Sequence, residues 1–241
     1  MFGLGTLLNT AAIGVGGLVG HFFGKLFGKK QQEALQKACG VSTLFIALSG
    51  AMEGMLKVED GSLSAGKSML VVLSLVLGTA IGELIGIEEG FERLGEFLKR
   101  KTGNSRDGNF VEAFVTATFT VCIGAMAIVG SIQDGIQGDW STLAVKSVLD
   151  LVIVAALTSS MGKGAVFSAL PVLVLQGSVT LLSRLIAPVL TDLALEYLSL
   201  VGSVLIFCVG VNLVWGKKIS VANMLPAVVL SALAAYLPVG F

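Results

Sequence analysis

Six ionisable residues lie within or beside long apolar stretches, where their chemistry would be that of proton or cation carriers. They are His21, Glu53, Glu83, Glu112, Asp134 and Asp150. A charged group inside a bilayer costs about 2.5–3.5 kcal/mol on insertion scales, so each position merits a functional hypothesis. Carboxylates exchange protons and hold cations, and an imidazole titrates near neutral pH. We therefore take these six residues as candidates for an ion or substrate pathway.

Most of these candidates also have a structural interpretation. Glu53, Glu112 and Asp134 fall within about two helical turns of the ends of predicted spans, where they could cap a helix or reach water. Glu83 could form an ion pair with a nearby lysine or arginine. Asp150 lies deepest, and its alternative role is a hydrogen bond to a neighbouring helix.

Metal and cofactor chemistry has little support in the sequence. His21 is the only histidine, so a site with several histidines is excluded; a proton relay with Glu83 and a structural role both remain open. The three cysteines show no CxxC pair or other metal-ligand spacing. There is no nucleophile motif, phosphate-binding loop or dinucleotide fingerprint in a credible context. We expect no metal, no cofactor and no enzymatic activity.

Uncharged polar residues extend the list of pathway candidates. Glu112, Thr116, Thr120 and Gly124 recur at every fourth position and draw a polar stripe along one helical face. Asn9 and Asn212 place amides in other apolar stretches. The stripe could line a polar pathway, or it could join neighbouring helices.

Composition identifies the class of protein that must position these residues. The 241 residues are 54% apolar and only 13% charged, with 31 glycines and a mean hydropathy of +0.90. Such a mixture is typical of an all-α polytopic membrane protein. The net charge is zero, which gives no argument for a nucleic-acid partner. We expect the lipid bilayer to be the main partner.

Eight apolar stretches are long enough for transmembrane spans, which need about 20 residues each. They lie near residues 4–24, 38–57, 67–87, 109–133, 142–160, 164–185, 198–216 and 219–238. Only a short turn separates the fifth from the sixth, so 142–185 could instead form two re-entrant halves. This division places twelve basic residues on one side and four on the other, the four being Lys57, Lys67, Lys146 and Arg184. By the positive-inside rule both termini are extracytoplasmic.

Two rows of glycines predict close helix packing. Gly16, Gly20, Gly24 and Gly28 recur every fourth residue, and the same spacing returns at Gly78, Gly82, Gly86 and Gly90. Glycines at this spacing let two membrane helices approach closely. His21 and Glu83 occupy equivalent places in the two rows. We expect the rows to face each other, with these two residues at similar depth.

The duplicated rows suggest internal repeats within one integral membrane domain, residues 1–241. Residues 1–66 would be a partial copy, 67–160 a three-span repeat and 164–241 an inverted three-span repeat. Apolar helices ending in glycine and a polar residue are also common without duplication. Amphipathic segments, of which residues 88–101 are the clearest, predict short interfacial helices between spans.

The opening residues Phe2 to Gly20 (FGLGTLLNTAAIGVGGLVG), followed by the pair Gly82-Glu83, resemble the bacterial membrane family called domain of unknown function 554. The resemblance covers nearly the whole chain, and residues 9–20 are its most specific part. It implies a small multi-pass protein of the bacterial inner membrane, sometimes labelled a transport protein. It implies no substrate, cofactor or catalytic residue.

Two functions fit these observations. The first is a small secondary transporter or channel for an ion or small solute, coupled to protons or cations through intramembrane carboxylates. The second is a membrane scaffold that acts through helix packing and basic cytoplasmic loops. Glycine rows that pack on each other within one chain and leave a wet cleft lined by the carboxylates would favour transport, whereas rows facing lipid or a second copy would favour the scaffold. Homo-oligomerisation is left open.

Overall fold

The computed structural model describes residues 2–59, 62–105, 107–123, 125–188 and 190–238. Over these residues the chain forms α-helices, two short 3-10 helices and one β-hairpin. In order they are α1 (Leu4–Gly24), α2 (Lys29–Met55), β1 (Leu56–Glu59), β2 (Ser62–Ala65), α3 (Ser68–Ile85), α4 (Ile87–Lys101), α5 (Phe110–Cys122), α6 (Ala125–Gln137), α7 (Ser141–Met161), η1 (Lys163–Ser168), α8 (Ala169–Leu181), α9 (Ser183–Ile186), α10 (Asp192–Trp215), η2 (Val221–Met224) and α11 (Pro226–Ala234).

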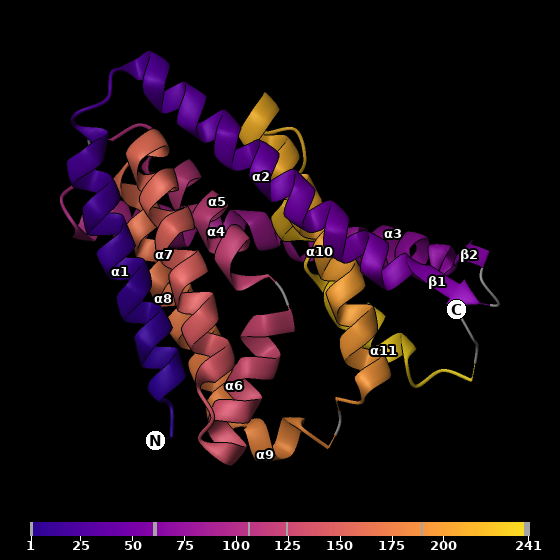
Figure 1. Cartoon of the computed structure of the whole chain (residues 1–241). Helices are drawn as coiled ribbons and strands as arrows, with labels where there is room; N and C mark the ends of the chain where they lie inside the picture. The colour runs from indigo at the N-terminus through magenta and orange to yellow at the C-terminus, as the bar shows by residue number, and fades with distance from the viewer. Residues whose placement is uncertain (1, 60–61, 106, 124, 189, 239–241) are drawn as a thin grey trace.

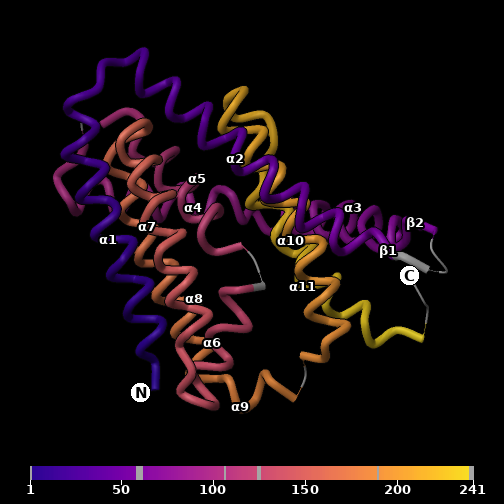
Figure 2. Tube along the Cα trace, in the orientation of Figure 1, coloured from indigo at the N-terminus to yellow at the C-terminus, as the bar shows by residue number. Residues whose placement is uncertain are grey.

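The long helices form two groups. Figure 1 shows α1, α6, α7 and α8 on one side and α2, α3, α10 and α11 on the other. In the first group α1 packs along α7 and α8, and in the second α2 packs along α10 while α3 packs against α11. The trace in Figure 2 crosses to the second group in α2, returns through α4 and α5, and crosses again after α9. Helix α5 contacts both groups, and the main apolar core includes its Phe119 with Leu157 and Leu205.

The all-α polytopic fold class is confirmed. Among the described residues, six helical segments are long and apolar enough to cross a membrane, and a bent pair, α5 with α6, makes up to seven. The eighth predicted span contains a shorter apolar helix, Val221–Ala234. Residues 142–185 lie within two segments that are each long and apolar enough for a span, Ser141–Met161 and Lys163–Leu181. The count of eight crossings stays a prediction.

The fourth predicted span is the one that the structure interrupts. Residues 109–133 were expected to form a single helix, but α5 ends at Cys122, α6 begins at Ala125, and their axes differ by 61°. Gly124, the last member of the predicted polar stripe, lies outside the described residues. The break leaves carbonyl groups at the end of α5 without partners inside that helix.

The first members of both glycine rows pack inside the chain, but their partners differ from those expected. A Cβ on Gly28 or Gly86 would meet only a side chain three residues further on, and one on Gly90 would meet nothing within 4 Å, so the packing predicted for these three glycines is wrong. A Cβ on Gly16, Gly20 or Gly24 would meet Leu151, Ala155 or Ser159 of α7, each partner one turn beyond the last. In the second row, a Cβ on Gly78 would meet Ala227 of α11, and one on Gly82 would meet the Asn223 carbonyl of η2. The prediction that the two rows face each other is therefore wrong. Which helix each row packs against depends on the tertiary fold and cannot be read from the glycine spacing.

The amphipathic segment 88–101 forms helix α4, as predicted. Phe91 of α4 packs edge-on against Phe119 of α5, with ring centroids 4.9 Å apart. Acidic residues occupy the first turn of α4 and basic residues its last turn, which is the charge order that the helix dipole favours. Helix α4, which was predicted to lie at the membrane interface, thus also packs against α5.

The segments that follow α7 and α10 resemble each other. Each long helix ends at a glycine with positive φ, Gly162 or Gly216. Each glycine is followed by a lysine, a 3-10 helix and a Leu-Pro pair (Leu170-Pro171 and Leu225-Pro226). The 3-10 helix η1 packs on α1 and η2 packs on α3, the two helices that carry the glycine rows. The pattern supports duplication, while the inverted three-span repeats stay a prediction.

Two of the four basic residues assigned to the sparse side of the membrane are buried. Lys67 is 6% exposed; it donates to the Gly54 carbonyl at 3.0 Å and forms an ion pair with Glu196. Lys146 is 8% exposed and lies inside α7. The predicted orientation then rests on twelve basic residues against two, Lys57 and Arg184.

The glycine contact between α1 and α7 predicts a specific loss of stability. We expect Gly20→Ala to lower the thermal midpoint of the purified protein, because its methyl group would overlap the Ala155 carbonyl; overpacking of this kind costs about 1–3 kcal/mol. The matched control is Gly14→Ala in the same helix, where a Cβ meets nothing within 4 Å. Equal midpoints for the two variants would contradict the packing of α1 on α7.

Candidate functional site

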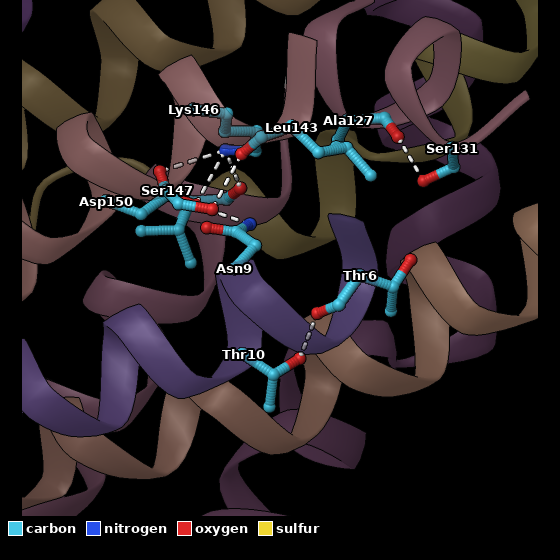
Figure 3. A network of polar contacts seen from close by, with 10 residues as sticks. Thr6, Asn9, Thr10, Ala127, Ser131, Leu143, Lys146, Ser147 and Asp150 are labelled. Atoms are coloured by element: carbon cyan, nitrogen blue, oxygen red, sulfur yellow. Dashed lines mark hydrogen bonds and ion pairs between the residues drawn. The ribbon is translucent and has the colours of Figure 1, made fainter. Parts of the chain in front are cut away.

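A buried ion pair with an amide partner lies between α1 and α7. Lys146 and Asp150 are one turn apart on α7, and the Lys146 Nζ lies 2.9 Å from the Asp150 carboxylate. Asn9 of α1 donates from Nδ2 to Asp150 Oδ2 at 2.9 Å. Figure 3 shows the three side chains converging. Because Asp150 is 3% and Asn9 0% exposed, the predicted deep position of Asp150 agrees with the structure.

Lys146 also binds the end of α5, at the break in the fourth predicted span. Its Nζ donates to the Val121 carbonyl at 2.8 Å, one residue before the end of α5. The C-terminal end of a helix carries partial negative charge and unpaired carbonyls, so an ammonium group is favourable there. Lys146 was predicted to lie near the membrane surface, and it instead joins α5 to Asp150. The spacing Lys146-x-x-x-Asp150 is the sequence signal that identifies the pair.

A second buried carboxylate, Asp134, lies at the beginning of α1. Its Oδ2 accepts from the backbone N–H groups of Gly5 at 2.9 Å and Thr6 at 3.4 Å. Asp134 is 0% exposed. A carboxylate at a helix N-terminus pairs with free N–H donors and with the positive end of the dipole. Asp134 of α6 thus caps α1 from a distant part of the chain.

Between these two carboxylates lie amide groups with unmet hydrogen-bonding capacity. The Asn9 Oδ1 and both polar atoms of the Gln176 side chain are buried and have no hydrogen-bond partner among the described residues. An unpaired buried polar group costs about 1–3 kcal/mol, so these atoms mark a place where a water, proton or ion would be stabilised.

The position of Gln176 follows from its neighbours on α8. One turn further along, Thr180 shares a hydrogen bond with Thr6 of α1, with 3.1 Å between the hydroxyl oxygens. One turn earlier, Val172 packs with Ile13. Gln176 therefore lies beside the part of α1 between Thr6 and Ile13, which includes Asn9. Between Asp150 and Asp134, polar groups of α1, α6, α7 and α8 make separate contacts along α1, and we call this group the polar core.

Three other predicted site residues line one separate cavity. Glu112, Thr116 and Asn212 contribute to a cavity of about 310 Å³ between α4, α5 and α10. Asn212 has a structural task there, because its Oδ1 accepts from the Lys218 and Ile219 N–H groups and its Nδ2 donates to the Ile219 carbonyl. Thr120 donates to the Thr116 carbonyl and so satisfies itself on its own helix.

The remaining candidates do not join either place. Glu53 and Glu83 are exposed on α2 and α3. His21 is half-buried at the cytoplasmic-side end predicted for α1, where it lines a pocket with Lys163 and Asp107. Asp150, Glu112 and Glu83 lie in three different places: the first is buried between α1 and α7, the second lines the cavity beside α4, and the third is exposed on α3. The similar depth of His21 and Glu83 stays a prediction. Within the described residues, no group of three His, Cys, Asp or Glu side chains could hold a metal ion.

The ion pair in the polar core predicts strongly coupled effects on stability. We expect Lys146→Met or Asp150→Leu alone to cost about 3–5 kcal/mol, because each leaves an uncompensated buried charge. The double variant replaces the pair with apolar groups and should unfold at a higher temperature than either single variant. Thermal unfolding in detergent measures all three. Additive losses in the double variant would contradict a direct pair.

The comparisons with known proteins agree with this fold. The family model described as "Protein of unknown function (DUF554)" matches residues 4–236. The "Uncharacterized membrane protein YdfK" of Bacillus subtilis (strain 168) is 26% identical over 227 residues, covering 94% of this chain and 93% of the relative. The "Uncharacterized protein YqgA" of Escherichia coli (strain K12) is 25% identical over 232 residues, covering 95% and 94%. No solved structure matches. The match over almost its whole length shows that this chain belongs to the DUF554 family.

Proposed function

We propose that this membrane protein is a small secondary transporter in which Lys146 and Asp150 carry the coupling charge. The observation behind the proposal is the buried Lys146–Asp150–Asn9 centre with unpartnered amide atoms beside it. Ionisable residues inside membrane segments are expensive and commonly mark ion or proton pathways. The proposal places the protein in the bacterial cytoplasmic membrane with both termini outside the cytoplasm.

The charge balance of the pair suggests how it would work. With Asp150 ionised and Lys146 protonated, the centre is neutral and stable in a low-dielectric interior. When Asp150 takes up one proton, the Lys146 ammonium loses its counter-charge. An uncompensated buried charge is costly, so the protonated centre favours a conformation that admits water or an anionic partner. Loss of the proton restores the ion pair and the closed arrangement.

Two features position the pair for such a cycle. Asn9 links Asp150 to α1, and Lys146 links it to the break between α5 and α6. Broken helices occur at the coupling sites of many secondary transporters, where helix ends face the ion. A change in the charge of Asp150 would therefore act on both helices at once.

The scaffold alternative receives less support. It required glycine rows that face lipid or a second copy, whereas Gly16, Gly20, Gly78 and Gly82 contact other helices of the same chain. The transporter hypothesis expected the two rows to pack on each other around a wet cleft lined by carboxylates. They pack on other helices instead, so the transport proposal rests on the polar core.

Proton flux in reconstituted vesicles tests this function. Wild-type protein in vesicles carrying an internal pH dye should dissipate or build a pH gradient when a broad panel of ions and small solutes is supplied. We expect Asp150→Asn to reduce this flux at least tenfold, since the amide cannot exchange a proton. Glu53→Gln, a change on the exposed surface of α2, is the matched control and should keep wild-type flux.

Two results would contradict the proposed transport function. If Asp150→Asn is folded, as judged by its elution profile and helical content, and keeps wild-type flux, then Asp150 carries no coupling charge. Wild-type protein without flux for the whole panel would also sink the proposal.

A further inference from the structure

The cavity between α4, α5 and the turn after α10 has a different charge from the polar core. Its titratable lining residues are Glu88 and Glu92 of α4, Glu112 of α5, and Lys217. Three carboxylates and one ammonium leave two net negative charges. Apolar side chains, among them Val115, Phe119 and Leu213, form much of the rest of the wall. The cavity therefore combines excess negative charge with apolar surface.

Glu88 is the deepest carboxylate of this cavity. The residue is 7% exposed, and its Oε2 is buried without a hydrogen-bond partner among the described residues. Its backbone N–H donates to Asn223 Oδ1 of η2 at 2.8 Å, which holds the beginning of α4 against η2. An ionised oxygen without a donor is costly when buried. Glu88 therefore contributes a deeply buried carboxylate to the lining of the cavity.

Lys217 already places one ammonium at the mouth of this cavity. Its Nζ forms ion pairs with Glu88 and with Glu92, the latter at 2.8 Å. The Lys217 side chain is 52% exposed and follows Gly216, which ends α10 with positive φ. Hydrogen bonds to Glu88 and then Glu92 raise the pKa of Lys217, so it stays charged. The lysine shows which chemical group the carboxylates accept, and its flexible arm can withdraw towards solvent.

We propose that this cavity binds a small ammonium cation, which displaces the Lys217 ammonium and takes over its hydrogen bonds to Glu88 and Glu92. The exposed Glu112 adds negative charge to the lining, and the apolar wall accommodates a short alkyl group. The excess negative charge disfavours anions. If the proposed transport function holds, the inference also supplies its substrate class; the binding itself is independent of transport.

Isothermal titration of the detergent-purified full chain at low ionic strength tests the inference. The probe is methylammonium, and tetramethylammonium is the comparison cation because it carries the same charge without N–H donors. We expect saturable methylammonium binding at least tenfold tighter than that of tetramethylammonium. Glu88→Gln should weaken methylammonium binding at least tenfold, and Glu112→Gln, near the cavity edge, is the second variant if Glu88→Gln does not fold.

The sharpest prediction concerns Lys217, because its removal should improve binding. Lys217→Met removes the tethered competitor and should tighten methylammonium binding several-fold. Lys163→Met, the change at the corresponding position after Gly162, is the matched control and should leave affinity unchanged. No saturable binding to the wild type and to Lys217→Met, or equal weakening by Lys163→Met and Lys217→Met, would overturn the inference.

These outcomes separate the inference from the proposed transport function. Methylammonium binding should persist in Asp150→Asn, which alters the polar core and leaves this cavity intact. Asp150-dependent proton flux without methylammonium binding would reject the cation site and retain the transporter. Binding that needs Glu88, without any flux, would support the cation site alone.

Discussion

The Lys146–Asp150 ion pair joins α1, α5 and α7 at one buried point, in addition to the apolar contacts that these helices share. Asp150 binds Asn9 of α1, and Lys146 binds the end of α5 through the Val121 carbonyl. A buried pair is stable only when both charges are compensated and hydrogen-bonded. The glycine contacts between α1 and α7, from Gly16 to Gly24, bring the helices close enough for this geometry.

The two helix groups use a similar scaffold for different chemistry. In each group a glycine-row helix packs against a 3-10 helix that follows a Gly-Lys turn. In the first group the polar residues are buried among α1, α6, α7 and α8. At the turn of the second group they surround an open cavity, where Lys217 meets Glu88 and Glu92. The two groups thus share these packing features and differ in their charged side chains.

Hydropathy predicted most of the helices well, but the sequence did not reveal the polar contacts between them. Residues 4–24 were expected as the first span, and α1 has these bounds. The break after Cys122 was missed because residues 109–133 contain no proline or polar turn that would mark it. Asp150 was recognised from its depth, yet Lys146 was assigned to the membrane surface because it lies near a span end. The further partners of the pair are Asn9 for Asp150 and the Val121 carbonyl for Lys146. They come from helices far away in the sequence, so the sequence alone does not show these contacts.

Infrared difference spectroscopy of the reconstituted protein tests the central claim, that Asp150 changes its protonation state inside the bundle. On lowering the pH, we predict a carbonyl band of a protonated carboxylic acid that is present in wild type and in Glu53→Gln and is missing in Asp150→Asn. Identical difference spectra of wild type and Asp150→Asn, over the whole pH range in which the protein stays folded, would contradict the claim.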